Sequence, residues 1–402
     1  MPTSPCAVIA SGRCRGVVAC ARQVDLDRSF GHESGMSLSP SSENIVARYP
    51  GTRGNARGMA MMSALLNAKA LYQDAFALGL AAIEQAPDDM EVRDMVRTAL
   101  GAGVPDFHAA MLRDEPRNRC YAAAIEQLVR SHMLVLDIGT GAGLLALLAA
   151  RAGARVVTCE SNPIVAAAAR EIIARNGLAD RIEVIAKPST ELVIGVDLPE
   201  PADLLVSEIF GNQLFGEGVV ASLADARERL VKPDAVIVPT HAELRCALAA
   251  WGEPRGAAPI GTVEGFDLSP FNLLVGRQRS VHAGKRNFEL RSAIHSALAM
   301  DFAARPPFGP VNETIHFTAT GGRVDAVAQW LRIDFGGGIV FENDPRTGPP
   351  SHWHAPMFEF VAPLETIEGQ AVACEARHVG ARLTLRVFDP DQAGSAGLAR
   401  HA

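Results

Sequence analysis

Along residues 131–240, the hydrophobic positions alternate between a strand-like pattern and a helical pattern. Short apolar runs of strand length are followed by helical patterns rich in alanine and leucine, and glycine, proline or asparagine separates them. Strands that alternate with helices indicate an α/β fold, a doubly wound parallel sheet. The strands that this pattern predicts are 133–138, 155–160, 182–186, 203–207 and 235–239.

The helix after the second strand carries its own start and stop signals. Asn162 can cap its first turn, and Pro163 suits the position that follows a cap. Asn176-Gly177 supplies the left-handed end. These local signals agree with the sheet pattern, which supports the same fold from an independent direction.

Upstream, the apolar spacing becomes helical from Gly58 onward, in an alanine-rich setting. Ala75, Ala82 and Pro87 lie at spacings that resemble a tetratricopeptide helical pair. One such unit cannot bury its own apolar face, so we expect a helical cap packed on the next domain, with a peptide-binding arm as the alternative. Residues 1–57, rich in Ser, Pro and Gly near their end, are expected to be disordered.

After Pro239 the pattern changes again, from helices to strands separated by Gly, Pro and Asn. Strand-like segments occur at 330–335, 338–341, 357–364 and 381–388, which predicts an antiparallel β-barrel or sandwich. The domain boundaries that these patterns predict are 1–57 (disordered), 58–104 (helical pair), 105–240 (parallel sheet), 241–390 (β-barrel domain) and 391–402 (frayed tail).

Composition limits the function classes. The 402 residues are 48% hydrophobic, enough for two or three domains with cores. The net charge of −7 argues against direct nucleic-acid binding and suits a cationic substrate. No apolar run reaches the roughly 20 residues of a membrane span. Seven scattered cysteines match no metal-site spacing and fit a reducing compartment, so we expect a cytoplasmic protein without a metal.

A glycine-rich turn, Gly139 to Gly143, follows the apolar run 133–138. Dinucleotide sites favour G-x-G-x-x-G, whereas Leu144 stands at the third glycine position here. S-adenosylmethionine has no phosphate and therefore needs no anion cradle. With Asp137 before the turn and Glu160 ending the next strand, where an acid can bind ribose hydroxyls, the pattern favours an S-adenosylmethionine site.

Two acidic residues follow the fourth predicted strand. Glu208 lies at its end, and the loop EIFGNQLFGEG continues to Glu217. Carboxylates match the planar fork of a guanidinium group, so this pair beside a methyl donor suggests an arginine-like acceptor. The alternative is a pair of solvated loop acids, although ligands of open α/β sheets bind beyond strand ends such as that of Glu208.

Three spaced motifs resemble the protein arginine methyltransferase family. The segment S-E-x-x-G-x-x-L-x-x-E-G at 207–218 resembles its double-glutamate loop, and 107–125 resembles the helix that closes over the cofactor. PPSHWHAPMFEF at 349–360 resembles its Thr-His-Trp loop, with Ser351 in place of threonine. Together the resemblance covers roughly 105–390.

Finer similarity points to the seven- and nine-type branch of that family, through AKPSTEL at 186–192 and LFGEGVV at 214–220. Those relatives usually carry two tandem catalytic modules, and one type carries tetratricopeptide-like repeats. Only one module is visible here, so the resemblance implies that a homodimer replaces the tandem pair. The region 252–285 lies where the family inserts its dimerisation arm.

The resemblance also implies roles for individual residues of the cofactor site. Arg117 would bind the methionine carboxylate of the cofactor, and Glu160 would bind its ribose. Ser189 would contact the adenine amino group, with a plain turn role as the alternative. The pocket floor would be formed by Asp137, Gly139 and Gly141.

For the acceptor, Asp114 and His352 match residues that pair across the two domains of the family. They would either accept a proton after transfer or fasten the helix to the barrel. Trp353 would form a wall beside the acceptor guanidinium, and Phe210 would help to set the product type.

The sequence therefore predicts methyl transfer to arginine in a protein or peptide, with Glu208 and Glu217 clamping the guanidinium. One alternative is a methyltransferase for a non-protein, small-molecule acceptor. Another is a non-catalytic scaffold that retains the fold, which would fail to bind S-adenosylmethionine.

Overall fold

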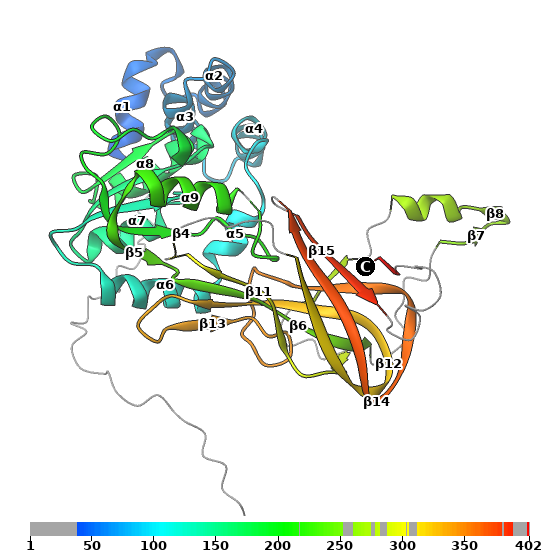
Figure 1. Ribbon diagram of the computed structural model, residues 1–402. Coiled ribbons are helices and arrows are strands. Elements are labelled where there is room, and N and C mark those ends of the chain that lie inside the picture. The colour runs from blue at the N-terminus through cyan, green and yellow to red at the C-terminus, as the bar shows by residue number, and fades with distance from the viewer. Residues whose placement is uncertain are drawn as a thin grey trace, which may run out of the picture. The chain divides into compact units, whose positions relative to one another are not determined.

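The computed structural model describes residues 38–216, 218–251, 260–274, 278–281, 288–302, 304, 312–379, 382–388 and 400–401. Two sheets organise these residues. The first is parallel, in the order β3-β2-β1-β4-β5, and the second is antiparallel (Figure 1). Among the described residues, no helix combines the length and the apolar character that crossing a bilayer requires.

The parallel sheet confirms the doubly wound domain. Its strands are β1 (Leu134–Ile138), β2 (Arg155–Cys159), β3 (Ile182–Ile185), β4 (Ala202–Ser207) and β5 (Val231–Val238), each pairing in parallel with its neighbours. All five residues of β1 are buried, which explains its continuous apolar run. The strand order reverses between β1 and β4, and the crevice at the carboxyl ends of these two strands is where such sheets bind ligands.

Four helices accompany this sheet, α6 (Glu115–Leu128), α7 (Leu144–Arg151), α8 (Pro163–Arg175) and α9 (Val219–Arg229). The predicted signals of α8 are confirmed. Asn162 caps its first turn by accepting from the backbone N–H groups of Ile164 and Val165, and Gly177 has a positive φ of 68° just after the helix.

The helical cluster consists of α1 (Pro40–Arg48), α2 (Ala56–Ala68), α3 (Tyr72–Gln85) and α4 (Met90–Gly101). Its apolar side chains form one core that also includes Ile164 of α8, so the cluster packs on the parallel-sheet domain. Helix α1 lies within the segment 1–57, for which we predicted disorder. A Ser39 cap and the buried side chains of Ile45 and Val46 account for this helix. A short helix, α5 (Phe107–Leu112), follows the cluster.

The antiparallel sheet confirms the predicted β-domain. Its longest strands, β12 (Asn312–Asp334) and β14 (Ala355–Val379), pair with each other and curve strongly (Figure 1). Its main hydrogen-bonded order is β10-β6-β12-β14-β15-β16. This order is an open path over the described residues, so a closed barrel stays a prediction. The other strands are β6 (His241–Trp251), β9 (Gln278–Val281), β10 (Phe288–Leu290), β11 (His295–Asp301), β13 (Val340–Glu342), β15 (Arg382–Phe388) and β16 (Arg400–His401).

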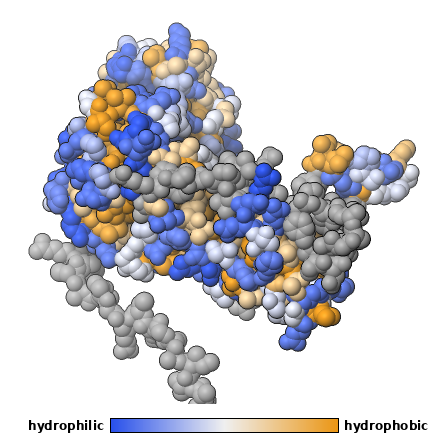
Figure 2. Space-filling model, in the orientation of Figure 1, coloured by the Kyte–Doolittle hydropathy of each residue, from blue (hydrophilic) through white to orange (hydrophobic). Residues whose placement is uncertain are grey.

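A small hairpin, β7 (Thr262–Val263) and β8 (Phe266–Asp267), is followed by the short helix η3 (Ser269–Leu273). We call residues 260–274 the arm. Its apolar side chains are exposed, with 72% of Phe266, 90% of Leu273 and 78% of Leu274 accessible. They form apolar patches on the surface of the arm (Figure 2). The remainder of the predicted region 252–285 is only partly within the described residues.

Candidate active site

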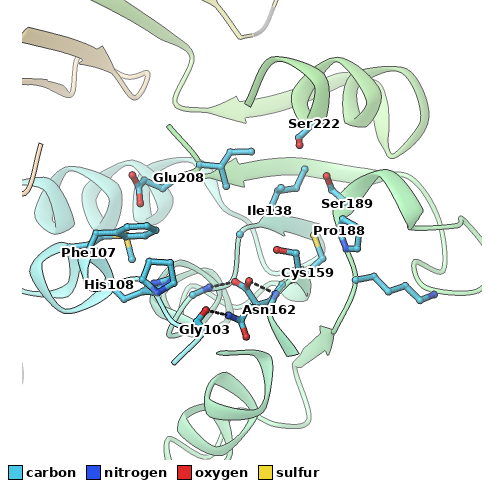
Figure 3. A pocket seen from close by; sticks show the side chains of 18 residues that line it. Gly103, Phe107, His108, Ile138, Cys159, Asn162, Pro188, Ser189, Glu208 and Ser222 are labelled. Atoms are coloured by element: carbon cyan, nitrogen blue, oxygen red, sulfur yellow. Dashed lines mark hydrogen bonds between the residues drawn. The ribbon is translucent and has the colours of Figure 1, made fainter. Parts of the chain in front are cut away.

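A cavity of about 430 Å³ opens at the carboxyl ends of β1 and β2 (Figure 3). The glycine-rich turn forms its floor, with Gly139 at φ 87° and Gly141 at φ 51°. A Cβ atom on Gly139 would lie 2.5 Å from Cγ2 of Ile209, so this position requires glycine. Its other lining residues include Phe107, His108, Met111, Ile138, Cys159, Glu160, Asn162, Lys187, Ser189, Glu208 and Ser222.

Glu160 lies directly after β2 and is held by two backbone donors. Its Oε2 accepts from the N–H of Gly141 at 3.0 Å, and its Oε1 accepts from the N–H of Asn162 at 2.9 Å (Figure 3). These bonds fix the carboxylate at the cavity wall. Each oxygen has a second lone pair, which can accept from a ligand hydroxyl.

Asp137 is fully buried at the end of β1, just before the glycine turn. Thr158 Oγ1 donates to its Oδ2 at 2.8 Å, and its Oδ1 has no hydrogen-bond partner among the described residues. Burial raises the pKa of this carboxyl to about 7, against the lowering effect of the Thr158 hydrogen bond. The structure therefore places a carboxyl with a raised pKa beneath the turn.

Arg117 and Glu208 form a buried ion pair at the side of the cavity. Nη2 of Arg117 lies 2.7 Å from Oε2 of Glu208, and their side chains are only 2% and 6% exposed. The Arg117 guanidinium also lies 4.8 Å from the ring of Tyr121 and 5.9 Å from that of Trp353. Helix α6 thus brings a cation to the end of β4.

Asp114 and His352 pair across the two sheets' domains, as the sequence predicted. Nδ1 of His352 lies 2.8 Å from Oδ2 of Asp114, and the same oxygen accepts from Ser351 Oγ at 2.5 Å. Asp114 also caps α6 by accepting from the backbone of Arg117. Burial raises the pKa of Asp114, but the hydrogen bonds from His352 and Ser351 outweigh it and hold this pKa below its usual value. Nε2 of His352 lies 3.9 Å from Oε1 of Glu208, which joins this pair to the buried ion pair.

Trp353 and Phe210 stack on each other with ring centroids 5.3 Å apart, and both are buried. The indole N–H of Trp353 donates to the carbonyl of Phe210 at 3.2 Å. Asn343, which the sequence did not single out, donates from Nδ2 to the carbonyl of Trp353 at 2.6 Å. Asn212 accepts from the backbone of His354 at 2.9 Å, so this bond and the Trp353–Phe210 bond join the loops of the two domains.

The structure brings most of the predicted site residues to one place. Arg117, Glu208, Asp114 and His352 form one contact network, while Glu160 and Ser189 line the cavity beside it. Glu217 lies outside the described residues. His108, to which the sequence assigned no role, also lines the cavity, and burial lowers its pKa while Glu160 opposes that shift.

Comparisons with known proteins identify relatives of the chain. Residues 119–240 match the family of the ribosomal protein L11 methyltransferase (PrmA). The chain is 38% identical over 318 residues to the arginine N(omega)-methyltransferase of Streptomyces achromogenes subsp. streptozoticus, covering 77% of this chain and 87% of that protein. It is 30% identical to protein arginine N-methyltransferase 7 of Oryza sativa subsp. indica, over 70% of this chain but 45% of that protein. The chain thus spans less than half of the rice relative.

Solved structures share the fold. The Trypanosoma brucei PRMT1 enzyme-prozyme complex with AdoHcy matches with a TM-score of 0.62 and 23% identity, over 74% of this chain and 96% of that chain. Arabidopsis thaliana protein arginine methyltransferase 10 matches with a TM-score of 0.58 and 20% identity, over 73% and 95%. At these identities the likeness shows the fold alone. Together with the sequence relatives, these findings show that the chain belongs to the protein arginine methyltransferase family, with similarity to its seven-type members.

Proposed function

We propose that the chain transfers a methyl group from S-adenosylmethionine to a guanidinium nitrogen of arginine. One observation carries this proposal within the family. Glu208 is a buried carboxylate beside the cavity, and it already binds a guanidinium, that of Arg117, at 2.7 Å. A carboxylate in this position can also bind the guanidinium of an arginine acceptor, because the two groups match in charge and in hydrogen-bonding geometry.

The residues of the cavity fit S-adenosylmethionine. Its volume of about 430 Å³ lies within the range of small-molecule sites. Glu160 has lone pairs for the two ribose hydroxyls, and Ser189 lies at the cavity wall for the adenine. Arg117 would bind the carboxylate of the methionine moiety, and the unpartnered Oδ1 of Asp137 would attract its ammonium group. Gly139 and Gly141 would let the cofactor lie on the backbone.

In the proposed mechanism the cofactor supplies an electrophilic methyl group on its sulfonium. Glu208 and Glu217 clamp the acceptor guanidinium and draw its positive charge away from the attacking nitrogen. His352, oriented by Asp114, lies near Glu208 and accepts or relays the proton that transfer releases. The stacked rings of Trp353 and Phe210 form an aromatic wall that favours a cation. No covalent intermediate with the protein is needed.

The names of the relatives suggest two classes of acceptor. Our proposal is arginine in a protein or peptide, as the rice relative is named. Arginine itself is the second candidate, because the Streptomyces relative is named for arginine and the chain covers 87% of it. Mass spectrometry of reactions with an arginine peptide and with free arginine would distinguish the two.

We further propose that the chain acts as a cytoplasmic homodimer and binds no nucleic acid directly. Cys120, Cys159 and Cys246 are free thiols, in keeping with a reducing compartment. The net charge of −7 supports the absence of nucleic-acid binding. Exposed Phe266, Leu273 and Leu274 on the arm provide an apolar surface for a second copy.

Calorimetric titration with S-adenosylhomocysteine tests the cofactor site. We expect micromolar binding that Glu160→Ala abolishes, because this carboxylate would hold both ribose hydroxyls. Glu183→Ala, an exposed acid on neighbouring β3, is the matched control and should bind like the wild type. Absence of binding by folded wild-type protein would favour the scaffold hypothesis instead.

A further inference from the structure

The linker between α4 and α5, residues 102–106, forms part of the wall of the cofactor cavity. Gly103 and Pro105 line the cavity beside Phe107 and His108 (Figure 3). The linker continues directly from the last residue of α4. The helical cluster therefore reaches the cofactor site through this segment.

Asn162 joins three structures at this corner of the cavity. Its Oδ1 caps α8 by accepting from the backbone N–H groups of Ile164 at 3.1 Å and Val165 at 3.4 Å. Because the oxygen is used by the cap, the amide nitrogen faces the linker and donates to the carbonyl of Gly103 at 2.8 Å (Figure 3). The backbone N–H of Asn162 donates to Glu160.

A second cavity lies on the other side of the linker. It has a volume of about 480 Å³ and is lined by Gly103 and Asn162 together with Tyr72 and Asn67 of the helical cluster. Gly103 thus stands between two cavities, with no side chain of its own to pack. The hydrogen bond from Asn162 therefore restrains this part of the wall on the side of the cavity, while the neighbouring Val104 packs on the core of the helical cluster.

The helical cluster is fastened to α8 along the length of that helix. Near its start, Ile164 is buried in the core of the cluster. Near its end, Ser41 donates to Glu171 at 2.6 Å, and Arg175 forms ion pairs with Glu171 and Glu84. The helical cluster and α8 are therefore packed together, and the linker extends from this packed unit. At the cavity, the Asn162–Gly103 hydrogen bond joins the linker to the start of α8.

We propose that Asn162 is a positioning residue that holds the linker of the helical cluster against the ribose end of the cofactor cavity and so slows cofactor release. This inference rests on the proposed function, since the ligand is the cofactor. It assigns to the helical cluster a part in cofactor retention. Opening the linker would require breaking the Asn162–Gly103 bond, so its loss should raise the dissociation rate more than the association rate.

Two variants separate this contact from the helix cap. Asn162→Asp and Asn162→Ser both keep an oxygen that can cap α8, but neither can donate to Gly103 through an amide nitrogen. Asn55→Asp is the matched control, because Asn55 caps α2 through its Oδ1, which accepts from Gly58 at 2.9 Å far from the cavity lining. Stopped-flow measurement of S-adenosylhomocysteine dissociation from the full chain provides the readout.

We expect both Asn162 variants to release S-adenosylhomocysteine about threefold to tenfold faster, with unchanged thermal unfolding midpoints, while the control matches the wild type. An unchanged rate in both variants would overturn the inference. Acceleration in Asn162→Asp alone would also overturn it, since the cause would then be a new charge beside Glu160. If the wild type bound no S-adenosylhomocysteine, the proposed function itself would fail, which is a different result from unchanged rates.

Discussion

At the scale of single residues, Glu208 lies between the guanidinium of Arg117 and the imidazole of His352. Its Oε2 binds Arg117, and its Oε1 lies 3.9 Å from Nε2 of His352. A buried ion pair is costly to desolvate, so its presence at a cavity is better explained by function than by stability. Arg117 orients the carboxylate before any acceptor arrives, which is the preorganisation that the proposed mechanism needs.

Asp137 gives a prediction about pH. Its pKa of about 7 in the folded protein lies above the ordinary aspartate value of 3.8, so the folded state binds more protons than the unfolded state between these values. Asp137 therefore costs stability as the pH rises from about 4 to about 7, and the cost is complete above that range. Asp137→Asn removes this cost, and we expect it to gain about 4 kcal/mol relative to the wild type across that range.

Denaturant unfolding without ligand at several pH values measures this difference. Asp203→Asn is the opposing control. Burial raises the pKa of Asp203, but Lys232 and the backbone of Leu134 outweigh that effect and lower it. This variant should therefore lose stability relative to the wild type as the pH rises. A stability difference for Asp137→Asn that did not change with pH would contradict the assignment.

At this scale the sequence singled out residues that the structure brings together, but not the residues that support them. Asp114, Arg117, Glu208 and His352 stand in motifs that could be read one by one. Asn343 could not be identified in that way, because it belongs to none of these motifs and only supports the backbone of a residue that does. Its role appears once β13 and the loop before β14 bring it to the carbonyl of Trp353.

At the scale of elements, the predicted bounds of helices and strands were most accurate where a helix cap or a continuous apolar run marked them. Helix α8 begins at its predicted cap, and β1 and β2 begin and end within one residue of the predicted bounds. Strand β5 begins at Val231, before the predicted residue 235, because polar Lys232 and Asp234 interrupt its apolar pattern. The long pairing of β12 with β14 depends on contacts distant in sequence, which periodicity does not reveal.

Close packing of the helical cluster gives a second prediction. A Cβ on Gly79 of α3 would lie 3.0 Å from Leu100 Cδ1, Ser63 Oγ and Val96 Cγ1. We expect Gly79→Ala to destabilise the protein by about 1 to 3 kcal/mol despite the better helix propensity of alanine. Gly101→Ala in α4 is the control, because its Cβ would meet only Arg97 Cγ at 3.8 Å. Thermal unfolding measures both, and equal midpoints for the two variants would contradict the packing argument.

At the scale of the whole molecule, the chain combines one parallel-sheet domain with a helical cluster and an antiparallel β-domain. Relatives of the seven type are longer, and the chain covers 45% of the rice protein. If two copies of this chain replace a tandem arrangement, the arm is a surface that presents several exposed apolar groups for that contact.

The dimer hypothesis predicts the effect of charges on the arm. Leu273→Asp with Leu274→Asp should convert a homodimer into a monomer in sedimentation experiments, because two desolvated carboxylates would oppose association. Ile367→Asp is the control, since Ile367 is also 75% exposed but lies on β14, outside the arm. A wild type that sedimented as a monomer at all concentrations would refute the dimer.

The most direct test of the account is methyl transfer itself. The 402-residue chain is incubated with S-adenosylmethionine and with either an arginine peptide, its lysine counterpart or free arginine, and the products are analysed by mass spectrometry. We expect methylation of arginine only, reduced at least ~100-fold by Glu208→Gln. Glu115→Gln, which alters an exposed ion pair with Arg119, should retain full activity. Methylation that persisted in Glu208→Gln, or that fell on lysine, would contradict the account.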